Sequence, residues 1–287
     1  ARGVFSAPFD GHLFEVARLP APDVDDGATT LAALDALLAA RGDDLAALVV
    51  EPLCLGAGGM RLWSEATLRA LAERCRAHGV LLIADEVMTG FGRTGPLFAC
   101  ERAGVSPDVI CLSKGITGGF LPLGATAVTE TLFAGFLSDD RRRTLFHGHS
   151  YTANPLACAA ALASLALLRT PESAAARARI EAAHRRHLAA LTDHPLVRAP
   201  RVLGTVAALD VVDATRAGYL APIGRELAAY ALHEGVLLRP LGDACYLLPP
   251  YCMTDDELAH AYGVIARFLD GARAPATSVA GGVLDDA

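Results

Sequence analysis

The sequence has 287 residues, of which 53% are hydrophobic and 6% aromatic, and its formal net charge at pH 7 is −7. This composition is ample for a large buried core, and the length predicts about two domains. The acidic balance argues against a nucleic-acid-binding protein. The basic run Arg141–Arg143 directly follows Asp139 and Asp140, which is typical of a solvated loop.

Seven cysteines are scattered without any CxxC pair, and their odd number argues against a disulfide framework. The sequence has neither a basic segment followed by an apolar one at its start nor a run of about 18 apolar residues. We therefore expect a cytoplasmic protein. The chain starts at Ala1 rather than at Met, so we also expect it to be part of a longer protein.

In chain order, the first half alternates predicted helices with short apolar runs. Thr30 can cap a helix to about residue 40, and Ser64 can cap a second one, in which Leu68, Leu71 and Cys75 recur at helical spacing. The apolar runs predict buried strands over residues 45–50, 80–84 and 109–112, and a further strand over 121–129. This alternation indicates an α/β fold with a mainly parallel sheet covered by helices.

The second half begins with a predicted helix over 156–168 that is apolar nearly all round, so we expect it to be buried between layers. Thr170 and Pro171 mark a domain boundary. Six more elements follow: helices over 173–191 and 224–233, a strand over 202–212, a strand pair over 236–239 and 244–248, and a helix opened by the capping box Thr254-x-x-Glu257.

These elements predict a partial large domain over residues 1–169, which includes the interdomain helix. A smaller α+β domain is expected over 170–270. The small, polar residues 271–287 predict a disordered tail.

A carboxylate and an amine follow two neighbouring predicted strands. Asp85 comes directly after the run 80–84, and Lys114 comes almost directly after the run 109–112. Because ligands of open α/β sheets bind outside the carboxyl ends of the strands, both side chains are aimed at one crevice. A pyridoxal 5'-phosphate (PLP) enzyme needs such a pair, a lysine for the Schiff base and a carboxylate that keeps the pyridine nitrogen protonated. A solvated lysine and a helix-capping aspartate explain the two positions equally well.

Other polar features of the sequence are weaker. The glycine-rich segments GAGGM and GFGRTG match neither GxGxxG nor GxxxxGK, and we interpret them as tight turns. Glu51 ends the strand over 45–50 on the same side as Asp85, and it either faces the same site or caps a helix. His147 and His149 have no further histidine or cysteine at ligand spacing, so no metal site is expected.

Five segments together resemble the class III aminotransferases of PLP fold type I: EPLCLGAGGM, LLIADEVMTGFGRTGPLFACE, PDVICLSKGITGG, HGHSYTANPLACAAALASL and GVLLRPLGDACYLLPPY. Three of their parts (LFACE, HGHSYTANP, and LLRPLGD with YLLPPY) are similar to the branch that acts in biotin biosynthesis. The resemblance implies a homodimer that contains PLP. It also implies transfer of an amino group from S-adenosylmethionine to 8-amino-7-oxononanoate, which gives 7,8-diaminononanoate.

The resemblance implies five cofactor-binding residues. Lys114 matches the Schiff-base lysine, which also carries the proton, and Asp85 matches the partner of the pyridinium nitrogen. Val87 would lie against one face of the ring. His149 and Ser150 match a loop that reaches the cofactor phosphate from the neighbouring subunit.

Four further residues match positions that contact substrate. Arg239 matches the arginine that binds the carboxylate of the keto acid, for which a guanidinium fork is well suited. Gly148, in the same loop as His149, belongs to this group, and so do Tyr246 and Arg93.

The sequence departs from the family in two ways. Many class III enzymes have glutamine at the position of Met88, which weakens a resemblance to the ornithine and ω-amino-acid branches and fits the biotin branch. The N-terminal portion, which supplies a Gly-Ser phosphate loop and an aromatic residue stacked on the ring, is absent. Two alternatives stay open: a class III enzyme for an ω-amino acid or with lysine as donor, and a fragment without activity of its own.

Overall fold

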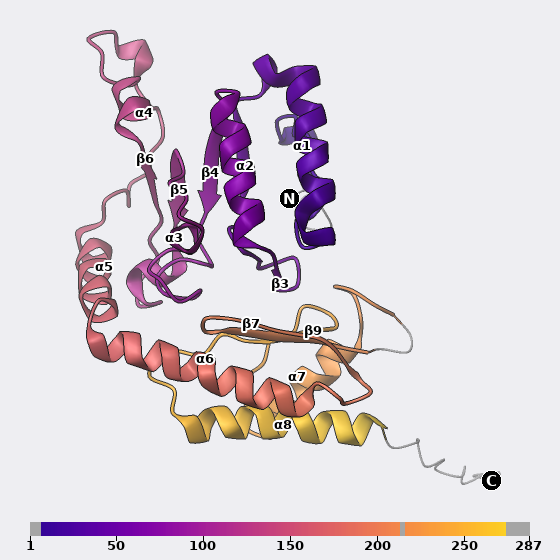
Figure 1. The fold of residues 1–287 in the computed structure, drawn as a ribbon. Helices are drawn as coiled ribbons and strands as arrows, with labels where there is room; N and C mark the ends of the chain where they lie inside the picture. Colours follow the sequence, from indigo (N-terminus) through magenta and orange to yellow (C-terminus); the bar gives the residue numbers. More distant parts are fainter. Residues whose placement is uncertain (1–6, 213–215, 274–287) are drawn as a thin grey trace, which may run out of the picture.

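The first half of the structure is a four-stranded sheet with helices packed against it (Figure 1). The computed structural model describes residues 7–212 and 216–273. The strand order is β1-β4-β5-β6, in which β6 is antiparallel and the others are parallel: β1 (Ala47–Val50), β4 (Leu81–Asp85), β5 (Val109–Leu112) and β6 (Ala125–Val128). The accompanying helices are α1 (Ala28–Arg41), α2 (Glu65–Ala77), α3 (Ala99–Ala103) and α4 (Glu130–Ala134).

Helix α2 shows how the sequence builds this half. The hydroxyl of Ser64 accepts a hydrogen bond from the Thr67 N–H at 3.0 Å and so caps the helix. Leu68, Leu71 and Cys75 form the stripe that faces the sheet, and none is more than 1% exposed. They share one apolar core with Ala84 of β4, which confirms the predicted cap and apolar stripe.

The second half is a three-stranded antiparallel sheet covered by three helices. The strand order is β7-β8-β9: β7 (Val197–Leu203), β8 (Val206–Val211) and β9 (Ala244–Leu247). Helices α6 and α8 run side by side below the sheet, next to α7 (Figure 1): α6 (Pro171–Leu191), α7 (Ile223–His233) and α8 (Asp255–Arg273). The two halves together have the α/β architecture predicted from the sequence.

A small contact region joins the two sheets. The hairpin β2 (Cys54–Leu55) and β3 (Arg61–Leu62) carries the GAGGM turn, which reaches β7 and β8. The guanidinium of Arg201 donates hydrogen bonds to the carbonyls of Gly59 at 2.6 Å and Met60 at 2.8 Å, and it pairs with Asp210 at 2.6 Å. The turn therefore serves as an attachment point between the sheets.

Three predicted elements differ from the structure. The strand predicted over 202–212 is the end of β7, a turn at Gly204 and Thr205, and β8. Residues 236–239 form no strand. The β pairing before β9 is limited to one isolated bridge, between Leu241 and Ala244. Helix α8 extends to residue 273, so the predicted tail 271–287 begins with helix, and its remainder, 274–287, lies outside the described residues.

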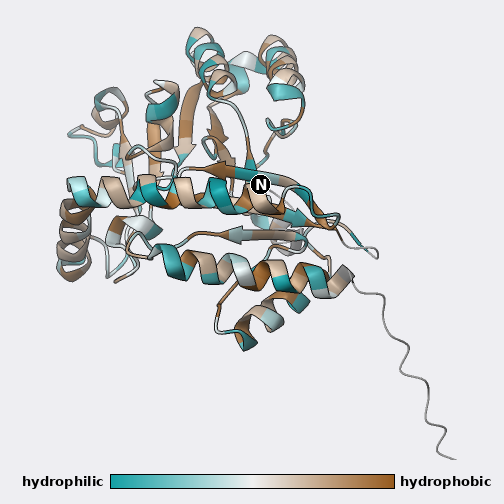
Figure 2. Ribbon diagram, turned by 60° about the horizontal axis from the view of Figure 1, so that its bottom comes forward, coloured by the Kyte–Doolittle hydropathy of each residue, from teal (hydrophilic) through white to brown (hydrophobic). Residues whose placement is uncertain are grey.

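Helix α5 (Pro155–Leu168) has the predicted position, but the prediction that it is buried is wrong for this chain. Leu156, Leu162 and Leu167 are each at least 70% exposed. Figure 2 shows the strongly hydrophobic colouring of this helix at the edge of the molecule. Large exposed apolar patches of this kind mark interaction surfaces.

None of the helices in the described part of the chain is long and apolar enough to span a bilayer.

His184 on α6 is a fully buried titratable group in the smaller half. Its Nδ1 atom lies 2.8 Å from the Tyr262 hydroxyl of α8. Burial lowers the pKa of His184 from 6.5 to about 4. Because the pKa of His184 is lower in the folded chain, the unfolded chain binds a proton at this imidazole at a higher pH than the folded chain does. The stability that neutral His184 provides is therefore complete above pH 6.5 and is lost as the pH falls toward 4.

We expect the free energy of unfolding to fall by roughly 2 kcal/mol between about pH 7.5 and pH 5 through this one group. Urea unfolding of the wild type and of His184→Gln at both pH values measures the effect, since glutamine does not titrate. His233→Gln is the control, because that side chain is 86% exposed. Equal pH dependence in the wild type and His184→Gln contradicts the prediction.

Candidate active site

Asp85 and Lys114 lie at the carboxyl ends of two adjacent parallel strands. Asp85 is the last residue of β4 and pairs in register with Cys111 of β5. The next backbone N–H, that of Glu86, donates to the Cys111 carbonyl at 3.0 Å. Lys114 follows β5 and opens the short 3₁₀ helix η4 (Lys114–Thr117). The structure therefore brings the carboxylate and the amine to the same edge of the sheet.

The backbone around this pair is tightly determined. The Asp85 Oδ1 atom accepts the Val87 N–H at 3.1 Å, which fixes the carboxylate at the end of the strand. Lys114 has a φ of 44°, in the left-handed region that residues other than glycine seldom adopt. Such a conformation costs roughly 1–3 kcal/mol and persists only where the surroundings impose it. Strained backbone of this kind gathers at functional sites.

Glu51 is a second acidic group near the pair. Burial raises the pKa of Glu51, a hydrogen bond from the Gly56 N–H at 2.9 Å opposes the rise, and the charges of Asp85 and Lys114 raise and lower it respectively. A charge influences another group only over a short distance. The Glu51 side chain thus holds the GAGGM turn through Gly56, and its facing the Asp85 and Lys114 site stays a prediction.

Glu86 is a buried residue beside the site whose supporting role the sequence did not reveal. Its side chain is fully buried and accepts three hydrogen bonds of 2.8 Å, from the Thr89 hydroxyl and from the N–H groups of Ala99 and Cys100. It thus ties the end of β4 to the start of α3 and holds Asp85 in place. The sequence signal for this role is the pair of adjacent acids, Asp85 and Glu86, at the end of a predicted strand. Side chains alternate along a strand, so the two carboxylates point to opposite faces of the sheet.

Arg93 lies in the GFGRTG loop at the contact between the two sheets. Its guanidinium donates to the Pro249 carbonyl at 2.6 Å and lies 4.8 Å from the centre of the Tyr251 ring. Its own carbonyl accepts the Thr205 N–H at 2.8 Å. A Cβ atom on Gly204, where φ is 56°, would lie 2.5 Å from that carbonyl, so the β7–β8 turn requires glycine here. A substrate contact of Arg93 stays a prediction.

Tyr246 and Arg239 come from the smaller half. Tyr246 of β9 packs in the apolar cluster that includes Met88, three residues beyond Asp85. Arg239 is exposed, and among the described residues no hydrogen bond or ion pair involves it. The neighbouring acid Asp243 holds the backbone instead, since its Oδ2 atom accepts the Gly218 N–H at 2.6 Å. The Arg239 guanidinium is available to a ligand.

The loop before α5 carries Gly148, His149 and Ser150, and all three are exposed. His149 is held locally, since its Nδ1 accepts the Tyr151 N–H at 3.1 Å. In residues 7–212 and 216–273, no hydrogen bond or ion pair joins this loop to Asp85 or Lys114. Helix α5, which follows the loop, packs against η4, where the Ser164 hydroxyl lies 3.4 Å from the Gly115 carbonyl.

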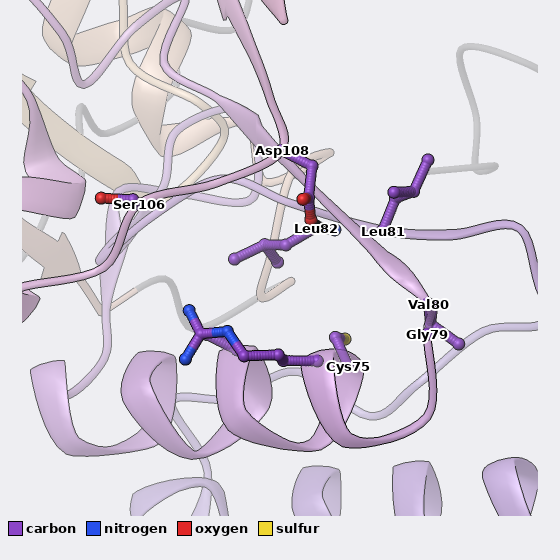
Figure 3. Close-up of a pocket in the computed structure, with 9 residues that line it drawn as sticks. Cys75, Gly79, Val80, Leu81, Leu82, Ser106 and Asp108 are labelled. Atoms are coloured by element: carbon purple, nitrogen blue, oxygen red, sulfur yellow. Dashed lines mark hydrogen bonds between the residues drawn. The ribbon is translucent and has the colours of Figure 1, made fainter. Parts of the chain in front are cut away.

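A cavity of about 190 Å³ lies at the opposite end of the sheet (Figure 3). Cys75 and Gly79 line it from the end of α2, and Leu82 and Asp108 line it from the starts of β4 and β5. The Asp108 Oδ2 atom accepts the Leu82 N–H at 2.8 Å. Because the amino ends of the strands meet here, this cavity is separate from the Asp85 and Lys114 site.

The chemistry of the site residues fits a PLP-like group. An amine can bind an aldehyde carbon, and a carboxylate can hold a protonated ring nitrogen. Lys114 is the sole lysine of the 287 residues, so the chain offers one amine for this purpose besides its terminus. Within the described part of the chain, no group of three His, Cys, Asp or Glu side chains could hold a metal ion.

Known proteins are similar to this chain in sequence. An adenosylmethionine-8-amino-7-oxononanoate aminotransferase of Synechococcus elongatus is 52% identical over 94% of this chain and 64% of its own length. The enzyme of that name from Nitratidesulfovibrio vulgaris is 45% identical over 86% of this chain and 48% of its own length. The chain thus spans about half to two thirds of the length of these relatives.

Solved structures show the same fold. The adenosylmethionine-8-amino-7-oxononanoate aminotransferase of Methanocaldococcus jannaschii superposes with a TM-score of 0.84 at 28% identity, covering 93% of this chain and 63% of that one. A PLP-bound amine transaminase from an uncultivated Pseudomonas species has a TM-score of 0.78 at 34% identity, covering 85% and 56%. The aminotransferase class-III family matches residues 4–269. The chain therefore belongs to the class III aminotransferases and has the α/β fold of PLP fold type I.

Proposed function

We propose that the protein is a PLP-dependent transaminase of biotin biosynthesis. It would pass an amino group from S-adenosylmethionine to 8-amino-7-oxononanoate and give 7,8-diaminononanoate. The observation that carries the proposal is the position of Lys114 and Asp85 at adjacent parallel strand ends, in a chain that is 52% identical to a relative of that name. Because this chain spans 64% of that relative, the proposal concerns the whole protein. A cytoplasmic location stays a prediction.

Bound PLP would supply an electron sink for the carbanion that forms when the donor loses a proton. Lys114 would hold the cofactor at its aldehyde carbon, and its amine would serve as the base for the proton on the donor carbon. The Asp85 carboxylate would hold the proton on the ring nitrogen. Val87 would pack against the ring, and Glu86 keeps the end of β4 in place through its three hydrogen bonds.

We also propose a homodimer, in which His149 and Ser150 of one subunit bind the cofactor phosphate in the other. The exposed apolar side chains around this loop support it, because Phe146, Tyr151 and Leu156 are each more than 70% exposed. A two-fold contact would place each subunit's loop in the partner's site. Sedimentation of the whole protein as an active monomer would contradict the dimer.

We propose that Arg239 binds the carboxylate of the acceptor, with Tyr246 beside it. Arg239→Ala is expected to raise KM for 8-amino-7-oxononanoate by roughly 30-fold, since loss of a close charge pair costs about 2 kcal/mol or more. KM for the amino donor should change much less. Steady-state kinetics on both substrates measure the split. Arg225→Ala is the matched control, an exposed arginine on α7 of the same half. Equal changes for both substrates would make Arg239 structural.

A second candidate is a transaminase for another amine, such as an ω-amino acid or lysine as donor. This candidate is supported by the solved amine transaminase, whose sequence is 34% identical to this chain. Met88 argues against it, since a thioether does not donate a hydrogen bond to the phenolic oxygen of PLP.

One assay decides among these proposals. The whole protein, loaded with PLP, is given each amino donor in turn with 8-amino-7-oxononanoate, and 7,8-diaminononanoate is measured. The proposal expects product with S-adenosylmethionine. If product forms with lysine as the donor but not with S-adenosylmethionine, the second candidate is the correct one. The chain of 287 residues, assayed in parallel, shows whether it has activity of its own.

A further inference from the structure

Tyr251 reaches from the smaller half into the loop that follows Asp85. It lies between β9 and α8, and its hydroxyl donates a hydrogen bond to the Phe91 carbonyl at 2.8 Å. Burial raises the pKa of Tyr251, so the hydroxyl stays protonated and remains a donor. The ring is held between two guanidinium groups, those of Arg93 at 4.8 Å and Arg177 at 5.6 Å from its centre.

Phe91 is in turn the residue against which the lysine loop rests. It is 7% exposed, and its ring meets that of Phe98 edge to face at 5.7 Å. A Cβ atom built on Gly115 would lie 2.9 Å from the Cβ atom of Phe91, so the Gly115 backbone lies directly on this side chain. Gly115 follows Lys114, and any movement of Phe91 would therefore reach the lysine backbone.

The two residues joined by this contact are both strained. Phe91 has a φ of 58° and Lys114 a φ of 44°. Neither conformation is favourable for a residue with a side chain, so each must be imposed by its neighbours. For Phe91 the neighbours are the Tyr251 hydroxyl on its carbonyl and the hydrogen bond from the Gly92 N–H to the Leu97 carbonyl at 3.1 Å.

We propose that Tyr251 is a positioning residue for Lys114. Its hydroxyl holds the strained Phe91 backbone, and the Phe91 side chain supports the Gly115 backbone. Gly115 in turn fixes the position of Lys114 after the end of β5. The role of Lys114 in this inference rests on the proposed transaminase function. The consequence is that Tyr251, a residue of the smaller half, sets the geometry of the lysine through Phe91 and Gly115.

A simpler role for Tyr251 is packing, since its ring lies against the cluster of Ile180, Ala183 and Leu258. Tyr251→Phe separates the two roles, because phenylalanine keeps the ring between the guanidinium groups and removes only the hydroxyl. Tyr262→Phe is a matched control. It also removes a buried hydroxyl from the smaller half, one whose partner is Nδ1 of His184 at 2.8 Å, away from the lysine loop.

The first measurement is hydrogen exchange of the whole protein without PLP. In Tyr251→Phe, amides of residues 90–97 and 113–119 are expected to exchange about tenfold faster than in the wild type, because local opening becomes easier. In Tyr262→Phe these amides should keep wild-type rates, and any faster exchange should be found in α6 and α8. This readout needs neither cofactor nor substrate, so it tests the coupling even if the proposed function is wrong.

The second measurement is turnover per bound PLP in the loaded protein. Tyr251→Phe is expected to slow both half-reactions by the same factor, about tenfold, with each KM within twofold, because one misplaced lysine serves both. The pH at which the absorbance of bound PLP changes should also shift, whereas it should not in Tyr262→Phe. Unchanged exchange in the two segments, or equal effects of both variants on them, overturns the proposal.

Discussion

Lys114→Ala is expected to lower amino transfer by at least about 10³-fold, since loss of a positioned acid–base group alone costs 10²- to 10⁴-fold and the lysine also binds the cofactor. The fold should survive, because the Lys114 side chain is exposed and makes no hydrogen bond or ion pair within the described residues. Alanine is as strained as lysine at a φ of 44°, so backbone strain does not confound the comparison. Product formation by the whole protein is the measurement.

Lys114→Arg is the matched control for charge. A guanidinium keeps the positive charge but does not lose a proton in proteins, so it cannot act as the amine nucleophile. We expect it to be as inactive as the alanine variant. Substantial turnover in Lys114→Arg would mean that this position acts by charge, which contradicts the assigned role.

Asp85→Asn is expected to leave PLP bound and to reduce turnover by about 10²–10³-fold, the usual loss when one electrostatic catalytic group is removed. Asparagine keeps a side-chain oxygen that can accept the Val87 N–H, now at 3.1 Å, so local geometry should change little. The neutral amide no longer favours a proton on the ring nitrogen. Turnover and the PLP content of the purified protein are measured together.

Asp108→Asn controls for the loss of an acid in the same sheet. Its carboxylate accepts the Leu82 N–H at 2.8 Å at the opposite end of the strands. We expect a modest loss of stability, about 1 kcal/mol, and nearly unchanged turnover per bound PLP. If Asp85→Asn keeps wild-type turnover, or if both variants lose it equally, Asp85 does not serve the ring nitrogen.

The parts of the fold that local chemistry determines were predicted from the sequence. Strand β5 has the predicted bounds, Val109–Leu112, and Ser64 caps α2 as expected. Asp85 and Lys114 could be placed at one edge because parallel strands bring their carboxyl ends together. These conclusions need only apolar runs, caps and the rule of parallel sheets.

The errors arose where the environment comes from elsewhere in space. Helix α5 has an all-apolar sequence, which predicted burial, but its leucines are exposed in this chain. The turn at Gly204 was not recognised because its tight approach to Arg93 is a contact between distant segments. Residues 236–239 read as a strand by composition but have no neighbour to pair with.

The site was predicted incompletely for the same reason. Glu86 looks like a second surface acid until α3 supplies its N–H groups, which are 13 and 14 residues away along the chain. The contact of Phe91 with Gly115, and the bond from Tyr251 to Phe91 across 160 residues, have no local sequence signal. Residues with functional side chains could be named from a resemblance, whereas the residues that hold them required the structure.

The central claim is that Lys114 is the residue to which PLP is joined, and chemical trapping tests it most directly. The PLP-loaded whole protein is reduced with borohydride and digested, and the peptides are sequenced by mass spectrometry. A pyridoxyl group on the lysine of the peptide ICLSKGITGG is the predicted result. A PLP-loaded protein whose label lies on another residue, or which carries none after reduction, would contradict the assignment of Lys114.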